Sequence, residues 1–392
     1  MEGLERGRGV YVHIPFCLRR CDYCDFTTFA DRDEDIPAYV DALVAHIERF
    51  GGGPVSARSG PNPHLGGFWH DRDDDVALDS VFIGGGTPTY LPPADLSRVL
   101  AAVAEALPLD ADAEITVEAN PETISAEMAQ ALAAGGVTRV SLGAQSFDDR
   151  VLTTLGRWHD PASVETATGR LTEAGISRLS LDLIYGTPGE SDGSWQRSLQ
   201  RVVDLGVTHV SAYALTVEPN TPYASRVRRQ PALEPDEDVQ AARMQMAEET
   251  LSTAGLSRYE VSNWAVPGHE SRHNLTYWRG GEWLAFGSGA HGSWQGRRYW
   301  LVRDPSRYAR LVGAGAEPLG GEEWPDADQV RLERLMMGLR LVEGVPRAAV
   351  EPLDSTVLGT LIERGLVRAD HGWVAVTPTG RPLTDRIVRQ LA

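Results

Sequence analysis

The chain has 392 residues, of which 42% are hydrophobic, so it can bury a sizeable core and is longer than one ordinary domain. Its 37 Lys and Arg stand against 55 Asp and Glu, and the net charge of −18 argues against nucleic acid or an anionic membrane as the main partner. The sequence MEGLERGRGV lacks the apolar core of a signal peptide, and no apolar run reaches the roughly 18 residues of a membrane-spanning helix. We therefore expect a cytoplasmic protein without a transmembrane segment.

The first predicted strand, at residues 9–14, leads into CLRRCDYCDF, a segment that contains every cysteine of the chain. Cys17, Cys21 and Cys24 have the spacing C-x3-C-x2-C. An odd number of thiols is a poor framework for disulfides, a closed zinc site needs four ligands, and three cysteines would be unusual for catalytic zinc. Three thiolates can hold three irons of a 4Fe-4S cube and leave the fourth iron open to a ligand that is not protein. The motif therefore favours an iron-sulfur cluster.

Short β-rich segments alternate with helical segments over the first two thirds of the chain. The predicted strands cover residues 9–14, 78–83, 113–119, 138–144, 178–184 and 207–215. Helical periodicity is clear at residues 37–50, 93–107 and 125–136. Six βα units predict a parallel sheet that curves into a partial TIM-like (β/α)6 barrel.

Unusual residues follow five of the predicted strands. The cysteine loop follows the first strand, and GGGTPTY, residues 84–90, follows the second. Glu118 lies at the end of the third, Gln145 follows the fourth, and Asp182 begins the segment that ends the fifth. Glycines let a ligand approach the backbone closely, and carboxylates accept hydrogen bonds from ammonium or hydroxyl groups. Because barrel chemistry lies where strands end, we expect these residues to form one site.

A segment rich in Gly and Pro, residues 51–75, interrupts the βα pattern and has no periodicity. We interpret it as a surface insertion without chemistry. His64 and His70 leave a metal-binding alternative open.

The pattern changes again after residue 316. Residues 316–328 have the composition of a linker, and residues 329–344 form an amphipathic helical pattern. Residues 357–391 then show the order helix, strand, turn, strand, helix, which is typical of a winged-helix-like α+β domain. Mixed local charge favours packing or partner docking over DNA binding. We divide the chain into a barrel core at 1–225, a barrel extension at 226–315 and a C-terminal domain at 316–392.

The cysteine spacing, with an aromatic residue before the last cysteine, resembles the radical S-adenosylmethionine superfamily. In that family the amino and carboxylate groups of S-adenosylmethionine chelate the open iron, and an electron from the cluster cleaves the sulfonium to give a 5'-deoxyadenosyl radical. The order VHIPFC, GGGTPTYL, EANP, LGAQSF, LGRWH, LDLIYGTPGE and EPNTP is similar to that of the oxygen-independent coproporphyrinogen III oxidases. This resemblance implies that the contacts with S-adenosylmethionine fall on Tyr11, Gly85, Gly86, Thr87, Glu118, Gln145, Arg157 and Asp182.

Two features separate the chain from those oxidases. Phe26 stands where they carry a further cysteine, and only ten residues precede Tyr11. Both features resemble the HemW-type heme chaperones, a sister branch that also carries the signature H-N-x-x-Y-W. The matching segment here is HNLTYW, with His273, Asn274, Tyr277 and Trp278 as the implied heme-binding residues.

Taken alone, HNLTYW would be interpreted as a core histidine with two aromatic residues. Imidazole can also ligate heme iron, and aromatic rings can stack on the macrocycle. His273 and Tyr277 are four residues apart, so they would share one face of a helix. His291, in GSGAHGS, is the main competitor of His273 as the ligand.

The resemblance to the chaperones implies a protein that binds heme and transfers it to an acceptor apo-hemoprotein. A 4Fe-4S cluster and S-adenosylmethionine would be bound nearby, without coproporphyrinogen oxidase activity. Transient contact with a membrane protein stays open. The alternatives are a radical oxidase of coproporphyrinogen III or a related tetrapyrrole and, more distantly, an interaction module regulated by the C-terminal domain.

Overall fold

The computed structural model describes residues 6–51 and 77–392. The predicted insertion at 51–75, with His64 and His70, lies outside the described residues except for Gly51. Among the described residues, no helix is both long and apolar enough to cross a membrane.

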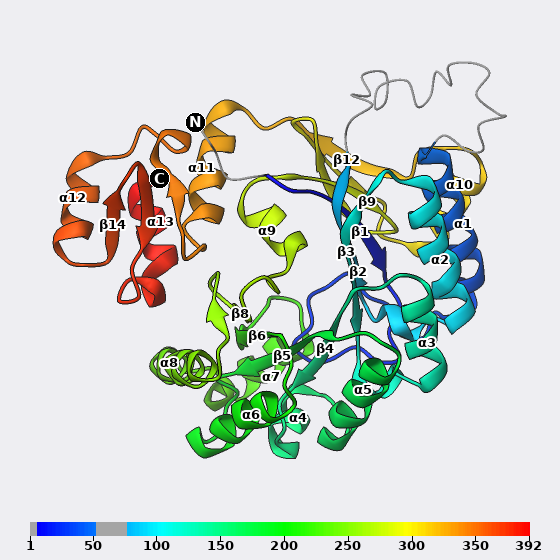
Figure 1. Cartoon of the computed structure of the whole chain (residues 1–392), viewed down its shortest axis with the longest axis horizontal. Helices are drawn as coiled ribbons and strands as arrows, with labels where there is room; N and C mark the ends of the chain where they lie inside the picture. The colour runs from blue at the N-terminus through cyan, green and yellow to red at the C-terminus, as the bar shows by residue number, and fades with distance from the viewer. Residues whose placement is uncertain (1–5, 52–76) are drawn as a thin grey trace.

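The core of the fold is a curved sheet whose central strands are parallel and follow one another in chain order. These strands are β1 (Arg8–Ile14), β2 (Leu78–Gly85), β3 (Leu109–Ala119), β4 (Arg139–Gln145), β5 (Arg178–Tyr185) and β6 (His209–Ala214). The intervening helices are α1 (Ile36–Phe50), α2 (Pro93–Ala106), α3 (Ala126–Ala134), α4 (Asp149–Leu155), α5 (Pro161–Glu173) and α6 (Asp192–Asp204). Figure 1 shows these helices on the outside of the curved sheet. The predicted partial (β/α)6 barrel is therefore confirmed.

The sheet is wider than the sequence predicts. Strand β9 pairs with β1 in parallel, and β10, β11 and β12 continue from it as antiparallel strands. At the other edge, β8 and β7 extend the sheet beyond β6. The bounds are β7 (Ser257–Arg258), β8 (Asn263–Ala265), β9 (Glu282–Phe286), β10 (His291–Trp294), β11 (Arg297–Leu301) and β12 (Leu319–Glu323). The helices of this region are α7 (Pro222–Arg229), α8 (Glu237–Thr253), α9 (Arg272–Trp278) and α10 (Pro305–Gly313).

Strand β1 shows how the sequence divides the two faces of the barrel. Val10, Val12 and Ile14 are fully buried in the main hydrophobic core. The alternate residues Tyr11 and His13 lie on the opposite face, where their side chains share a hydrogen bond. One face of the strand thus packs in the hydrophobic core, and the other face supplies polar groups to the inside of the barrel.

The C-terminal part is a small α+β unit with its own hydrophobic core and a three-stranded antiparallel sheet in the order β13-β15-β14. Its elements are α11 (Ala327–Gly338), β13 (Val345–Pro346), α12 (Ser355–Glu363), β14 (Val367–Asp370), β15 (Trp373–Val376) and α13 (Thr384–Leu391). The predicted order of helix, strand, turn, strand, helix is confirmed by α12, β14, β15 and α13.

Two expectations for this region were wrong. Residues 316–328 are not only a linker, because β12 (Leu319–Glu323) pairs with β11 in the barrel sheet. The helix expected over 329–344 ends at Gly338, where a Cβ would lie 2.6 Å from the Cβ of Val345. The chain turns there so that Leu341 can bridge to Glu260.

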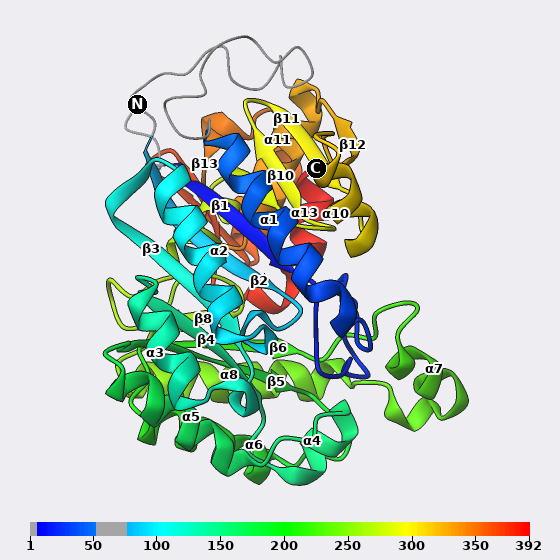
Figure 2. The same cartoon turned by 90° about the vertical axis from the view of Figure 1, so that its right-hand side faces the viewer.

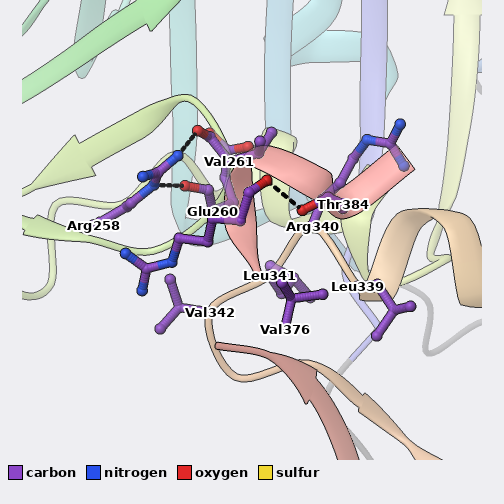
Figure 3. A pocket seen from close by; sticks show the side chains of 10 residues that line it. Arg258, Glu260, Val261, Leu339, Arg340, Leu341, Val342, Val376 and Thr384 are labelled. Carbon is purple, nitrogen blue, oxygen red and sulfur yellow. Dashed lines mark hydrogen bonds between the residues drawn. The ribbon is translucent and has the colours of Figure 1, made fainter. Parts of the chain in front are cut away.

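The contact between the barrel and the C-terminal part includes a buried carboxyl group, that of Glu260 (Figure 3). Val342 N donates to the Tyr259 carbonyl at 3.0 Å, which continues the bridge between Glu260 and Leu341. Glu260 is 0% exposed, and its Oε1 accepts from Ser262 N at 3.1 Å. Burial raises the pKa of Glu260 to about 7.

We expect the Glu260→Gln variant to lose part of the pH dependence of stability. Because the folded-state pKa of Glu260 is raised, the folded chain retains a proton between pH 4.5 and about 7 that the unfolded chain releases, so stability falls as pH rises through this window. Gln removes this cost, which is on the order of 3 kcal/mol. Thermal melts should show that the variant gains stability relative to wild type between pH 5 and pH 8. An equal difference between variant and wild type at both pH values would contradict the prediction.

Candidate cluster and cofactor site

The three cysteines lie in the loop after β1, at the carboxyl ends of the barrel strands. Cys17 and Cys21 are buried, Cys24 is half-buried, and all three line a cavity of about 530 Å³. Figure 2 shows this loop, in blue, beyond the end of β1 and on the same side as α4 and α7. Asp22 holds the loop in place, because its backbone N–H donates to the Leu155 carbonyl and its carboxylate pairs with Arg226 at 2.8 Å.

The donor set and its surroundings fit a 4Fe-4S cluster. In the described part of the chain, no three His, Cys, Asp or Glu side chains are grouped to hold one metal ion. A cube does not need such a group, because each thiolate binds a different iron. Burial raises the pKa of the Cys17 thiol to about 11, and the hydrogen bond from Thr87 Oγ1 opposes this shift. The Arg157 guanidinium lies 3.4 Å from Cys21 Sγ, where its charge would offset that of a cluster.

The glycine loop after β2 lies directly against the cysteine loop. Gly86 N donates to the Ile14 carbonyl at 2.7 Å, and Thr87 N donates to the Phe16 carbonyl at 2.8 Å. A Cβ on Gly86 would lie 2.6 Å from Phe16 O and 3.0 Å from Cys17 Sγ. Any other residue would therefore push the two loops apart.

Glu118, near the end of β3, faces the same cavity. Its Oε2 accepts from Gly85 N at 2.9 Å, and Gly85 has a φ of +112°, which favours glycine. The side chain is surrounded by protein on all sides except the cavity, and this burial raises the pKa of Glu118 to about 7. A cationic or hydroxyl group that entered the cavity would thus meet an acceptor whose ionisation it favours.

Arg157 is brought into the cavity by the end of α4, where Gly156 adopts a φ of +71°. Its Nη2 donates to Asn120 Oδ1 at 2.8 Å and to the Gly143 carbonyl at 2.7 Å. Its Nε is buried and has no hydrogen-bond partner among the described residues. Because Arg157 also lines the cavity, its fixed guanidinium is placed to pair with a carboxylate there.

Asp182 and Gln145 complete the carboxyl-end site, as we call the cavity lined by the cysteines and these residues. Asp182 accepts from Ser141 Oγ at 3.0 Å, and burial raises the pKa of its carboxyl group. Gln145 has a φ of +60°, in the left-handed region. The structure therefore brings together seven of the eight implied S-adenosylmethionine residues, namely Gly85, Gly86, Thr87, Glu118, Gln145, Arg157 and Asp182.

Tyr11, the eighth implied residue, does not line this cavity. Its hydroxyl shares a 2.8 Å hydrogen bond with His13 Nδ1, and its ring stacks on Phe82 with the centroids 6.3 Å apart. Phe82 in turn stacks on His273 at 5.3 Å, and His273 contacts Tyr277 edge-on at 4.7 Å. A continuous series of rings thus runs from the cysteine-loop end of the barrel interior towards α9.

The HNLTYW segment forms α9, so His273 and Tyr277 do lie on one helical face. His273 is 0% exposed, with Nδ1 3.1 Å from Ser80 Oγ and Nε2 2.7 Å from the Tyr277 hydroxyl. Burial lowers the pKa of His273 to about 3, so the imidazole is neutral. Binding of iron by His273 therefore requires that one of these hydrogen bonds be broken.

The segment lies at the amino ends of the strands, away from the cysteines. Arg272 N donates to Glu114 Oε1 at 3.0 Å, and a Cβ on Gly9, near the start of β1, would lie 2.7 Å from the His273 ring. Asn274 and Trp278 are half-buried. His291 is exposed and stacks on Trp300 with the ring centroids 6.0 Å apart.

Comparison with known proteins identifies the family. The profile of the radical SAM superfamily matches residues 71–202, and that of the HemN C-terminal domain matches residues 326–383. The chain is 40% identical over 386 residues, 98% of its own length and 94% of the relative's, to a protein of Mycobacterium tuberculosis named heme chaperone HemW. The chain belongs to the HemW family of the radical S-adenosylmethionine superfamily. The Escherichia coli heme chaperone HemW is 34% identical over 345 residues, 86% of this chain and 84% of that protein.

A solved structure of Escherichia coli coproporphyrinogen III oxidase, HemN, shares the fold of this HemW family member. It aligns with a TM-score of 0.78 and 23% identity, over 98% of this chain and 90% of the other. The likeness shows that the C-terminal part and the widened sheet belong to the common architecture.

Some residues of the carboxyl-end site in this HemW family member were not among the implied S-adenosylmethionine contacts. Asn120 donates to Thr87 Oγ1 at 3.0 Å and accepts from Arg157, so it links two implied ligand contacts. Ser141 and Tyr213 line the same cavity from β4 and β6. The sequence marks Asn120 by its place at the end of the third predicted strand, but Ser141 carries no such signal.

Proposed function

We propose that this HemW family member is a heme chaperone that binds heme and transfers it to an acceptor apo-hemoprotein in the cytoplasm. Identity of 31–40% over at least 97% of the chain with curated relatives named heme chaperone HemW carries the proposal. Phe26 supports the proposal, because it offers no thiol at the position where the coproporphyrinogen III oxidases carry a further cysteine. Its side chain is 65% exposed. We retain the division into a barrel core, an extension and a C-terminal domain as part of the proposal, with transient membrane-protein contact open.

Cys17, Cys21 and Cys24 would hold the 4Fe-4S cluster, and the carboxyl-end site would bind exchangeable S-adenosylmethionine. The cluster, when bound, supplies an electron for reductive cleavage of the sulfonium. Glu118 and Asp182 would accept from the ammonium or ribose hydroxyl groups, while Arg157 would pair with the carboxylate. The position of Arg157 in the cavity lining and the raised pKa of Glu118 support these roles. Tyr11 would support the site indirectly, through its hydrogen bond to His13, rather than by contact with the ligand in the cavity.

The HNLTYW segment would form the heme-binding region, with His273, Asn274, Tyr277 and Trp278 as its residues. Its aromatic rings suit a flat apolar ligand. The His273 imidazole is buried between the hydroxyl groups of Ser80 and Tyr277. It would therefore ligate heme iron only if α9 shifts, or would support heme binding indirectly through its hydrogen bond to Tyr277.

We expect the apo-protein to bind about one heme per chain, without an intact cluster. His273→Ala should shift the Soret band and weaken retention, since both the imidazole and the support of Tyr277 are lost. Absorption titrations of wild type, His273→Ala and His291→Ala measure this. A wild-type spectrum in both histidine variants would remove these residues from the heme site, and a wild-type protein that binds no heme would overturn the proposed function.

A further inference from the structure

A second large cavity lies at the amino end of the barrel, opposite the cysteines. It has a volume of about 820 Å³, within the roughly 300–1,000 Å³ range of cofactor pockets. Among its walls are Arg6, Tyr277, Trp283, Arg298, Arg334 and Met337. We call it the amino-end cavity. Figure 1 shows that α11, which supplies Arg334 and Met337, lies beside the start of β1 and next to α9.

The aromatic wall of the amino-end cavity continues the HNLTYW segment. Tyr277 and Trp283 contact each other edge-on, with the ring centroids 4.6 Å apart. Both side chains are half-buried, so their remaining surface faces a space rather than other side chains. Met337 adds an adaptable thioether from α11. A flat apolar molecule would find a wall suited to stacking here.

The cations of the cavity divide into those that are paired and those that are not. Arg8 lies 3.7 Å from Glu282, and Arg298 pairs with Glu333. For Arg6 and Arg334, no hydrogen bond or ion pair is found within the described part of the chain. The two lie near each other, since burial, followed by the charge of Arg6, lowers the pKa of Arg334. Two neighbouring cations favour a dianion.

Four carboxylates also line the cavity, those of Asp79, Asp110, Glu282 and Glu333. Glu282 and Glu333 are held by the paired arginines, and Asp79 Oδ2 accepts from Arg8 N at 3.0 Å. In a chain with a net charge of −18, two arginines without a partner among the described residues thus line the same cavity as the aromatic rings. Arg334 lies close to the end of the HNLTYW helix, because a Cβ on Gly280 would lie 3.8 Å from Arg334 Cγ.

We propose that the amino-end cavity is the heme-binding site, with Arg6 and Arg334 binding the two propionates and Tyr277 and Trp283 contacting the macrocycle. This inference rests on the proposed function and assigns its site. It places heme at the opposite end of the barrel from the cluster. Residues from the segment before β1 and from α9, β9 and α11 would then meet on one ligand.

The test is an absorption titration of the full-length apo-protein with ferric heme and, separately, with heme dimethyl ester, which lacks both propionate charges. Arg6→Ala and Arg334→Ala should each weaken heme binding about tenfold, as expected for one charge-assisted contact. Arg334→Lys should recover part of the loss, and thermal melts should confirm that each variant folds. Arg331→Ala is the matched control on α11, because its Nη1 lies 3.5 Å from the Val350 carbonyl in the C-terminal part.

The ester separates a propionate contact from a general charge effect. Wild type should bind the ester at least tenfold more weakly than heme, whereas the Arg6→Ala, Arg334→Ala double variant should bind both ligands alike. Unchanged heme affinity in the double variant, or an equal loss in Arg331→Ala, would overturn the assignment while heme binding by wild type still supported the proposed function. Absence of heme binding in wild type would instead remove the proposed function itself.

Discussion

The variant in which Cys17, Cys21 and Cys24 are all replaced by alanine should hold no cluster after anaerobic reconstitution. The wild-type chain should hold about four irons and four sulfides, because three thiolates can anchor a 4Fe-4S cube. These are the three cysteines of the chain, so no other thiol can substitute. Iron and sulfide assays with the absorption spectrum of the reconstituted protein measure the effect.

Heme binding by the same triple variant separates the two sites. The amino-end cavity and the cysteine loop are lined by different residues, so the variant should retain wild-type heme affinity. Full iron content in the variant would exclude the cysteines as ligands. Stoichiometric zinc with no iron in the wild-type chain would indicate a zinc site instead.

S-adenosylmethionine binding should weaken by about ten- to a hundredfold in Glu118→Ala and in Asp182→Ala, because each loses a charge-assisted hydrogen bond worth roughly 1.5–3 kcal/mol. Both carboxyl groups line the carboxyl-end site with the cysteines. Glu165→Ala is a matched control, since this carboxylate pairs with Arg201 outside the cavity. Calorimetry on the reconstituted protein would show unchanged affinity in both site variants if these residues do not contact the ligand.

The affinity for S-adenosylmethionine should also depend on pH. Burial raises the pKa of Glu118 to about 7 in the free protein, and a bound ammonium group would pair with the ionised carboxylate. Binding therefore releases a proton below about pH 7. The affinity for S-adenosylmethionine should fall by up to about tenfold for each unit by which the pH is lowered below 7. Glu118→Gln should remove this dependence. Calorimetry between pH 5.5 and pH 8 measures it, and an identical pH profile in the variant would assign the effect to another group.

The carboxyl-end site could be predicted from the sequence because its residues stand at consecutive strand ends, and parallel strands bring those ends together. Tyr11 shows the limit of this reasoning, since it was implied by resemblance but lies behind the cavity lining, bonded to His13. Strand β9 (Glu282–Phe286) was missed because it follows a helix and two glycines, outside the alternation of strands and helices that marks the barrel core.

The amino-end cavity could not be predicted. Arg6 and Arg334 are far apart in the sequence, and only the packing of α11 against α9 and the start of β1 brings them to one space. The helical face shared by His273 and Tyr277 was predicted correctly, and the burial of His273 matches the alternative interpretation as a core histidine. That burial depends on Gly9, whose missing side chain leaves room for the His273 ring.

The most direct test that distinguishes a heme chaperone from a coproporphyrinogen oxidase offers heme and coproporphyrinogen III to the same protein. The reconstituted chain is incubated anaerobically with reductant, S-adenosylmethionine, heme and coproporphyrinogen III, and the pigments in the protein and small-molecule fractions are then chromatographed. We expect about one heme per chain in the protein fraction and unchanged coproporphyrinogen III. Formation of protoporphyrinogen IX with no heme retained on the protein would contradict the proposed function.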